Sequence, residues 1–353
     1  MKNFTIHQSN IFGNYHGILF FKNFLQKNKN RKIFILVDSN TENYCLSFFY
    51  SLFNISKKSF LLRIPAGESS KSLAYVSFLF DELITHQADN DSLLINLGGG
   101  VVSDLGGFVA STFNRGMSYI NFPTTLLAQV DASIGGKTGV NFKGIKNKIG
   151  LINNPIFTIV LTEFIKTLPE QEFLSGYGEI CKYGLICNPS IWEYISKYKI
   201  NILDDPQYII YQSIKIKTDI VHKDNNEKGL RKILNFGHTI GHAIESVCQE
   251  ISLKHGICVV MGMICELYIS HILLKLPKQK LDIYVKVLNS NFALKKIKNT
   301  SQIISLIRHD KKNQKGKLLF SLISKIGHCH FNQEVSENLI DESLTFYNSL
   351  YNE

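Results

Sequence analysis

Short apolar runs bounded by polar or glycine-containing stretches fill the first part of the chain. They are rich in Ile, Leu and Phe, and they predict strands over 32–37, 60–64, 92–97 and 119–122. Such continuous apolar runs are typical of strands buried on both faces of a parallel sheet with helical crossovers. We therefore predict an α/β domain with a Rossmann-like parallel sheet over residues 1–159.

Beyond residue 163 the apolar positions recur with the 3.6-residue period of amphipathic helices. The pattern predicts helices over 208–220, 240–248, 258–274 and 281–288, and only one possible strand, over 318–323. Residues 160–353 are therefore expected to form a second, mostly α-helical domain.

Composition places the chain among ordinary soluble proteins, with 44% hydrophobic and 19% charged residues among its 353. No apolar run is expected to reach the roughly 20 residues of a membrane helix, and residues 1–27 lack the pattern of a secretory signal. The seven cysteines are odd in number and form no Cys-x-x-Cys pair, which favours a reducing compartment. We expect a cytoplasmic protein without a membrane partner.

The formal net charge of +10 is compatible with two kinds of anionic partner. Nucleic acid is one, but the lysines are spread along the whole chain and form no basic block or nucleic-acid-binding motif. A phosphorylated small molecule is the other, because a positive field concentrates anionic substrates at an enzyme. The second interpretation is favoured, and no nucleic-acid partner is expected.

Two histidines four residues apart stand in the most informative stretch of the chain, residues 230–245. On a helix, His238 and His242 would project from one face and could share a metal ion or an anionic substrate. The same spacing also arises by chance in a helical core, so spacing alone leaves both interpretations open. Glu179 lies upstream with Lys182 one turn later, and His255 opens the next apolar run.

A run of three glycines, residues 98–100, directly follows a predicted strand and leads into a predicted helix. There, backbone N–H groups could close on a pyrophosphate at the helix N-terminus. The Gly-x-Gly-x-x-Gly fingerprint is absent, so a purely structural turn is the alternative. Asp38, and Glu68 with Lys71, follow two other predicted strands, at the edge where open α/β sheets bind ligands.

Taken in order, these motifs resemble those of the 3-dehydroquinate synthase family. Its members are sugar-phosphate cyclases of the dehydroquinate synthase-like superfamily. The resemblance runs from Asp38 to about Gly327. It is carried by Pro65-Ala66-Gly67-Glu68 with Lys71, Gly98-Gly99-Gly100 with Asp104 and Gly107, Arg115-Gly116, residues 123–138 (PTTLLAQVDASIGGKT), Lys146-Asn147-Lys148-Ile149-Gly150, Glu179 with Lys182-Tyr183-Gly184, Asn235-Phe236-Gly237-His238, His255-Gly256 and Asp310-Lys311-Lys312.

The resemblance implies two cofactors. It places Zn²⁺ or Co²⁺ on Glu179, His238 and His255, a donor set that suits a catalytic metal site with open positions. In this interpretation His242 contacts the substrate and is not a metal ligand. NAD is implied at Asp38, Glu68, Lys71, Gly99, Gly100, Asp104, Thr124, Thr125, Lys137 and Lys146.

A substrate bearing both a carboxylate and a phosphate is also implied. Its site is expected to comprise Asp131, Lys137, Asn147, Lys182, Lys217, Arg231, Asn235, His242 and one of Lys311 or Lys312. Arg115 is the family position that reaches the active site of a neighbouring subunit, so the resemblance implies a homodimer.

The implied reaction converts 3-deoxy-D-arabino-heptulosonate 7-phosphate into 3-dehydroquinate and phosphate, a step of the shikimate pathway. In the family it proceeds by transient oxidation with NAD, elimination of phosphate, re-reduction and an intramolecular aldol closure. The enzyme would thus be a carbon–oxygen lyase with no net redox change.

Some positions depart from the family pattern. The residue before the metal-binding glutamate is usually alanine, and here it is Gly178; Gln171, Ile257 and residues 150–155 differ as well. Because glycine costs about 1 kcal/mol relative to alanine inside a helix, we expect Gly178 to lower stability and not to abolish activity.

Four alternatives remain open at this stage. Another sugar-phosphate cyclase would share the motifs and differ in pocket shape. A metal-dependent polyol or glycerol-phosphate dehydrogenase would lack the full set of Lys, Arg and Asn residues and would accumulate NADH. A degenerate, non-catalytic protein would keep the fold alone, and a nucleic-acid binder would lose affinity steeply with salt.

Overall fold

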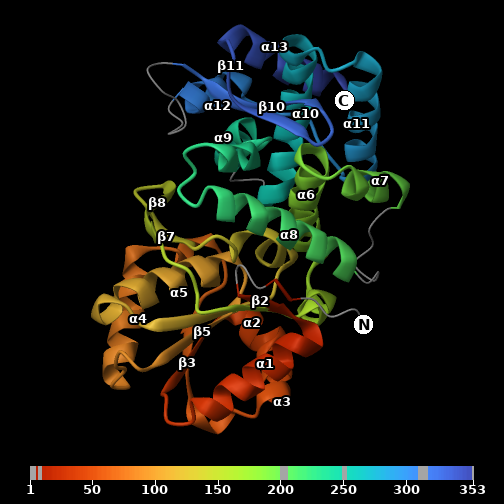
Figure 1. Ribbon diagram of the computed structural model, residues 1–353. Coiled ribbons are helices and arrows are strands. Elements are labelled where there is room, and N and C mark those ends of the chain that lie inside the picture. The colour runs from red at the N-terminus through yellow and green to blue at the C-terminus, as the bar shows by residue number, and fades with distance from the viewer. Residues whose placement is uncertain (1–4, 7–9, 199–205, 249–252, 309–316, 352–353) are drawn as a thin grey trace. The chain divides into compact units, whose positions relative to one another are not determined.

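The computed structural model describes residues 5–6, 10–198, 206–248, 253–308 and 317–351. The chain divides into two compact units, and Figure 1 shows its helices and strands. Unit 1 comprises Met1–Pro169 and Asp205–Thr218, and unit 2 comprises Glu170–Asp204 and Asp219–Glu353.

Unit 1 is built around a seven-stranded sheet of order β1-β2-β9-β6-β5-β3-β4. Only β1 runs antiparallel to its neighbour; every other pair is parallel. The strands are β1 (Thr5–Ile6), β2 (Ile11–Gly13), β3 (Ile33–Asp38), β4 (Ser59–Ile64), β5 (Leu93–Gly98), β6 (Ser118–Pro123) and β9 (Thr158–Val160). The four strands predicted from apolar runs are thus confirmed to within one residue at each end.

Alternate residues of the central strands enter two different hydrophobic cores. Ile33 and Ile35 of β3 pack with α1 (Asn14–Lys27) and α3 (Leu46–Phe53), whose phenylalanines cover one face of the sheet. Phe34 of the same strand packs with α4 (Leu73–Thr85) and α5 (Gly100–Thr112) on the other face. Burial on both faces explains why these strands read as continuous apolar runs and not as alternating ones.

The strand order contains a switch point between β3 and β5. From β3 the chain crosses to β4 on one side and then returns to add β5 and β6 on the other. Parallel sheets of this type bind ligands in the crevice at the carboxyl ends of the two strands that flank the switch. Asp38 and Gly98 end those two strands here.

An antiparallel hairpin of β7 (Lys137–Phe142) and β8 (Ile145–Ile152) adds to unit 1, and the sequence did not predict it. Most of β8 is exposed, so it lacks the buried run by which the other strands were recognised. A π-helix, Ala128–Ala132, follows β6. Helix α8 (Gln207–Lys223) begins in unit 1 and ends in unit 2.

Unit 2 is mainly helical, as predicted. Its elements are α6 (Glu170–Ile186), α7 (Pro189–Lys197), α9 (His238–Val247), α10 (His255–Leu274), α11 (Lys278–Asn291), α12 (Thr300–Arg308), the hairpin β10 (Leu319–Lys325) and β11 (His328–Glu334), and α13 (Glu337–Ser349). Helix α10 is the core element and contacts α6, α9, α11, α13 and β10.

Helix α10 corrects one expectation. Its 20 residues are long and apolar enough to cross a membrane by length and composition, although no apolar run of that size was expected. However, 72% of its most apolar stretch is buried within the fold. A helix that is apolar all round and buried is the usual central helix of a large core.

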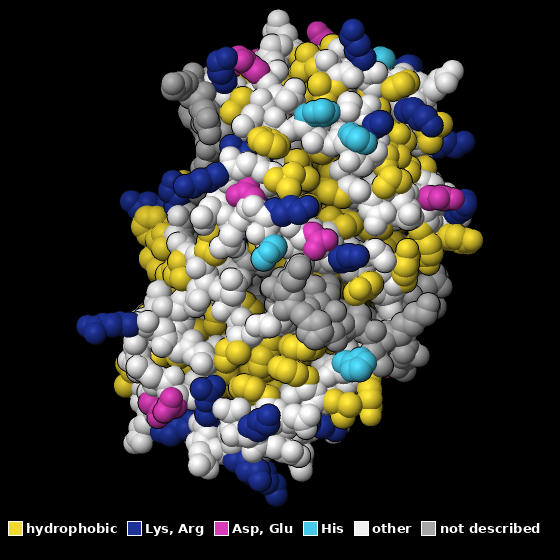
Figure 2. Space-filling model, viewed as in Figure 1, with side chains coloured by type: hydrophobic (Ala, Val, Ile, Leu, Met, Phe, Trp, Pro, Cys, Tyr) yellow, Lys and Arg dark blue, Asp and Glu magenta, His cyan; other side chains and the backbone are white. Residues whose placement is uncertain are grey.

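Lys and Arg side chains are scattered, singly and in small groups, among hydrophobic, acidic and neutral groups on the face seen in Figure 2. The excess of positive charge is therefore dispersed over that face, as the spacing of lysines along the sequence suggested.

Candidate metal and nucleotide sites

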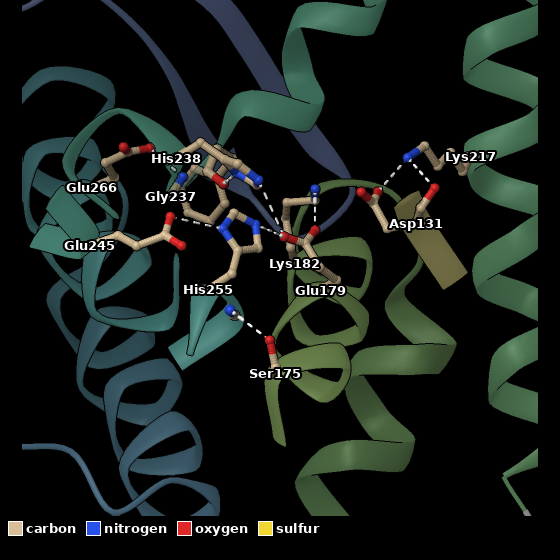
Figure 3. A network of polar contacts seen from close by, with 12 residues as sticks. Asp131, Ser175, Glu179, Lys182, Lys217, Gly237, His238, Glu245, His255 and Glu266 are labelled. Carbon is tan, nitrogen blue, oxygen red and sulfur yellow. Dashed lines mark hydrogen bonds and ion pairs between the residues drawn. The ribbon is translucent and has the colours of Figure 1, made fainter. Parts of the chain in front are cut away.

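Three elements of unit 2 bring a carboxylate and two imidazoles together (Figure 3). Glu179 comes from the middle of α6, whereas His238 and His255 are the first residues of α9 and α10. The Nε2 atoms of His238 and His255 lie 3.2 and 3.4 Å from Glu179 Oε1. Lys182, one turn further along α6, pairs with the other carboxylate oxygen.

His242 joins this cluster from the exposed side of α9. Its ring centroid lies 5.2 Å from that of His238 and 5.5 Å from that of His255. One nitrogen from each of the three rings lies within 4.8 Å of the others. The prediction that His238 and His242 share a helix face is confirmed, and the structure groups His242 with the proposed ligands.

Burial and neighbouring charges shift the pKa values of three residues of this cluster, Glu179, His238 and His255. Glu179 is fully buried, which alone would raise its pKa, but the positive charges of Lys182 and His238 hold that pKa well below its ordinary value. Burial and the charge of Lys182 lower the pKa of His238. Burial also opposes the protonation of His255, yet Glu179 and Glu245 outweigh it and raise its pKa to about 10.

Both oxygens of Glu179 are buried and make no hydrogen bond of good geometry with the part of the chain that the structure describes, although nitrogens lie at ion-pair distance. A buried carboxylate is costly without such bonds, unless it is paired with charge or coordinates a metal. One carboxylate and two or three imidazoles are also the usual donors of catalytic zinc. The residues present therefore fit a divalent metal ion.

The sequence missed the groups that support these side chains. His255 Nδ1 faces Glu245 Oε2 at 3.2 Å, and the backbone N–H of Gly256 donates to Ser175 Oγ at 3.1 Å. The backbone N–H of Gly237 donates to Glu266 Oε2 at 2.6 Å. Glu245 could have been found, because it lies seven residues after the first histidine and hence on the same helix face.

Gly178 has a packing role that its helix propensity does not reveal. A Cβ atom at this position would lie 2.4 Å from the carbonyl oxygen of Gly256, and one at Gly256 would lie 1.8 Å from the carbonyl oxygen of Ser175. The two glycines therefore allow the backbones of α6 and α10 to touch beside the cluster. Gly178 is thus expected to lower the stability of the helix, but it also permits the two backbones to approach this closely.

Arg231 and Asn235, both predicted to bind substrate, lie on the 3₁₀ helix Leu230–Asn235 of unit 2. Arg231 is 2% exposed, and its guanidinium donates to the carbonyl of Asn225 at 2.7 Å. Asp224, another residue that the sequence missed, accepts from the backbone N–H of Arg231 at 3.0 Å and fixes the turn before it.

In unit 1, several predicted nucleotide-binding residues lie at the switch point. Asp38 ends β3 and also caps α2 (Ser39–Tyr44), where its Oδ1 accepts from the N–H of Thr41 at 2.8 Å. Gly99 is the N-cap of α5 and Gly100 its first residue, so the predicted strand–glycine–helix turn is confirmed. Thr124, buried beside it, donates its N–H to the carbonyl of Gly98 at 3.0 Å, and Thr125 follows it directly in the chain.

A polar cluster from three elements stands near this turn. Lys71, 4% exposed, pairs with Asp104 Oδ2 at 2.5 Å and donates to Asn147 Oδ1. Asn147 was expected in the substrate set, and the structure places it against Lys71 of the nucleotide set. Glu68 lies on the exposed side and accepts from the amide of Asn141 at 2.8 Å.

The other predicted residues are distributed as follows. Lys217 pairs with Asp131 at 2.7 Å and is 6% exposed. The exposed residues of the predicted set in unit 1 are Glu68, Arg115, Lys137, Lys146 and Asn147. Lys311 and Lys312 lie outside the described residues.

The fold and the site define a class of protein: a doubly wound parallel sheet joined to a helical unit that carries a carboxylate–imidazole cluster. A solved 2-deoxy-scyllo-inosose synthase, complexed with carbaglucose-6-phosphate, NAD⁺ and Co²⁺, superposes with a TM-score of 0.86 at 23% identity, covering 97% of this chain and 99% of its own. The 2-epi-5-epi-valiolone synthase of Streptomyces hygroscopicus subsp. jinggangensis 5008, with NAD⁺ and Zn²⁺ bound, gives 0.86 at 20% identity and 99% coverage of both chains. These likenesses establish the fold.

The sequence comparisons establish the family. The 3-dehydroquinate synthase N-terminal family matches residues 61–175, and the corresponding C-terminal family matches residues 176–313. The 3-dehydroquinate synthase of Parabacteroides distasonis is 38% identical over 332 residues, which are 92% of this chain and 94% of that protein. The chain belongs to the 3-dehydroquinate synthase family, and the predicted family and fold class are confirmed.

Proposed function

We propose that the chain converts 3-deoxy-D-arabino-heptulosonate 7-phosphate into 3-dehydroquinate and phosphate, as an NAD- and metal-dependent lyase. The observation that carries the proposal is Glu179, a fully buried carboxylate that faces two imidazole nitrogens and Lys182 in a chain of this family. A buried ionised group with a strongly shifted pKa in a polar cluster is typical of a functional site.

Glu179, His238 and His255 are the residues that would hold the metal ion. When bound there, zinc or cobalt would act as a Lewis acid that stabilises negative charge on a substrate oxygen. Both metals suit a site of carboxylate and imidazole donors. His242, on the exposed side of the cluster, is well placed to contact the substrate phosphate.

The carboxyl ends of β3 and β5 would hold NAD, which would accept a hydride and return it, so that no NADH accumulates. The first turn of α5, with Gly99 as its N-cap, offers backbone N–H groups to a pyrophosphate. Asp38 lies at the end of the adjacent strand, where an acidic side chain accepts hydrogen bonds from ribose hydroxyls. Lys71 and Asp104 hold each other beside this turn.

Cationic residues of the predicted set would bind the substrate. Arg231 is the residue best suited to a carboxylate or phosphate, because its guanidinium can donate two parallel hydrogen bonds. Asp224 fixes the backbone around it, so the arginine is held before substrate arrives. Lys137 and Lys217 would act as point charges toward the anionic groups of the substrate.

A homodimer is part of the proposal. Arg115 is exposed and follows Asn114 in a turn where both residues have left-handed backbone conformations, with φ of 65° and 48°. Such conformations cost roughly 1–3 kcal/mol each in non-glycine residues and persist where the surrounding structure imposes them. A turn of this kind, which presents an arginine to solvent, supports contact with the site of a second copy. A cytoplasmic location is proposed with it.

The decisive experiment measures phosphate release from 3-deoxy-D-arabino-heptulosonate 7-phosphate with zinc and NAD, while absorbance at 340 nm is followed in parallel. We expect phosphate without accumulation of NADH, and no phosphate after chelation or with His255→Ala. Stoichiometric NADH would identify a dehydrogenase instead. A folded, zinc-loaded protein that releases no phosphate would contradict the proposal.

A further inference from the structure

His255 is held along its long axis between two carboxylates. Its Nε2 lies 3.4 Å from Glu179 Oε1, and its Nδ1 lies 3.2 Å from Glu245 Oε2 (Figure 3). The side chains of His255 and Glu245 are 26% and 13% exposed. The ring therefore has one nitrogen directed at the cluster and the other at a mostly buried acceptor.

On binding a metal ion through one ring nitrogen, an imidazole gives up the proton of that nitrogen and keeps a single N–H on the other. An acceptor at this second nitrogen stabilises the N–H and so leaves the lone pair of the first nitrogen for the metal ion. His238 obtains its acceptor from the backbone, because its Nδ1 lies 3.1 Å from the carbonyl oxygen of Phe236. His255 obtains it from the side chain of Glu245, which a substitution can remove.

Glu245 also connects two helices. It lies on α9, the helix that carries His238, whereas the ring it contacts begins α10. A single helix thus supplies one proposed ligand and the acceptor that orients another. We propose that Glu245 is a positioning residue of the metal centre, which holds His255 with hydrogen on Nδ1 and with the Nε2 lone pair directed at the metal. The inference rests on the metal site of the proposed function.

Zinc affinity tests the inference without any substrate. We would measure the dissociation constant of zinc by competition with a chromophoric chelator for the wild type, Glu245→Ala and Glu245→Gln. Removing an outer acceptor typically weakens metal binding by about 10–100-fold, and we expect that loss for Glu245→Ala. The glutamine variant should lose less, because its amide oxygen can still accept from Nδ1–H.

Glu172→Ala is the matched control. Glu172 pairs with Lys254 at 2.6 Å, so this variant removes a carboxylate beside the start of α10 without touching the ring of His255. Its zinc affinity should equal that of the wild type. The visible spectrum of the cobalt-loaded proteins gives a second measurement, and only the Glu245 variants should change it.

The outcomes separate the two proposals. Wild-type protein that binds no zinc would contradict the proposed function. Wild-type protein that binds zinc, with Glu245→Ala binding it equally well, would overturn only the role of Glu245. If the alanine variant does not fold, the isosteric glutamine variant decides: unchanged affinity together with an unchanged cobalt spectrum overturns the inference.

Discussion

Replacing Gly178 by alanine tests the close contact between α6 and α10. The new Cβ would lie 2.4 Å from the carbonyl oxygen of Gly256, whereas real Cβ contacts essentially never fall below 3.0 Å. The obstacle is backbone and not the flexible end of a side chain, so the two helices must move apart. Glu179 follows Gly178 directly and His255 precedes Gly256, so this movement separates the two proposed ligands.

Two opposing effects decide the change in stability. Alanine favours the helix by about 1 kcal/mol over glycine. Overpacking a well-filled site costs about 1–3 kcal/mol. We therefore expect the free energy of unfolding of the metal-free protein to fall by at most about 2 kcal/mol. Zinc affinity should fall at least about tenfold, because metal–ligand distances tolerate only about 0.2 Å.

Urea unfolding of the metal-free protein and chelator competition for zinc measure the two effects separately. Gly184→Ala is the control, since it lies on the same helix and its Cβ would meet its nearest neighbour, Trp192 N, at 3.1 Å. That contact needs a shift of only a few tenths of an ångström, and zinc affinity should not change. A Gly178→Ala protein that is more stable than the wild type and binds zinc equally well would refute the reasoning.

Three further experiments test other parts of the proposal. Mixing and reassembling inactive Arg115→Ala and His255→Ala proteins should restore about a quarter of wild-type activity if the arginine acts across a two-fold dimer, and none if it acts within one chain. Asp224→Asn should destabilise the protein at pH 7. Backbone hydrogen bonds, first that from Gly229, lower the pKa of this carboxyl below its ordinary 3.8. Its contribution to the free energy of unfolding is therefore complete above pH 3.8 and is lost as the pH falls further. Urea unfolding should show that the stabilities of the two proteins converge at the lowest pH. Lys182→Met leaves a buried glutamate without its cation and should cost the metal-free protein about 3 kcal/mol; an unchanged thermal midpoint would contradict the buried pair.

Elements that are buried on both faces could be predicted, because they require a continuous apolar run in the sequence. Strands β3 and β5 and helix α10 are of this kind. The β7–β8 hairpin was not, since most of β8 faces solvent and its identity depends on pairing with β7. A sequence pattern indicates well which segments are buried, but it indicates poorly which strands pair with one another.

The candidate site divides in the same way. His238 and His242 could be paired from helical spacing alone, whereas Glu179 and His255 were joined to them only through the family resemblance. No local pattern predicts that Asn147 lies against Lys71, because the two residues belong to different elements that meet only through tertiary packing. Ser175 and Glu266, which support the site from other elements, were missed for the same reason.

Helix α10, the central helix of unit 2, couples metal binding at the site to the stability of the fold. Because α10 begins with a proposed ligand and supplies much of the core, unfolding the core would also release the metal. By mass action, a ligand that binds only the native state at one hundred times its dissociation constant adds about 2.7 kcal/mol to stability. The concentration of metal in the cell would then influence how long the protein stays folded as well as its catalytic rate.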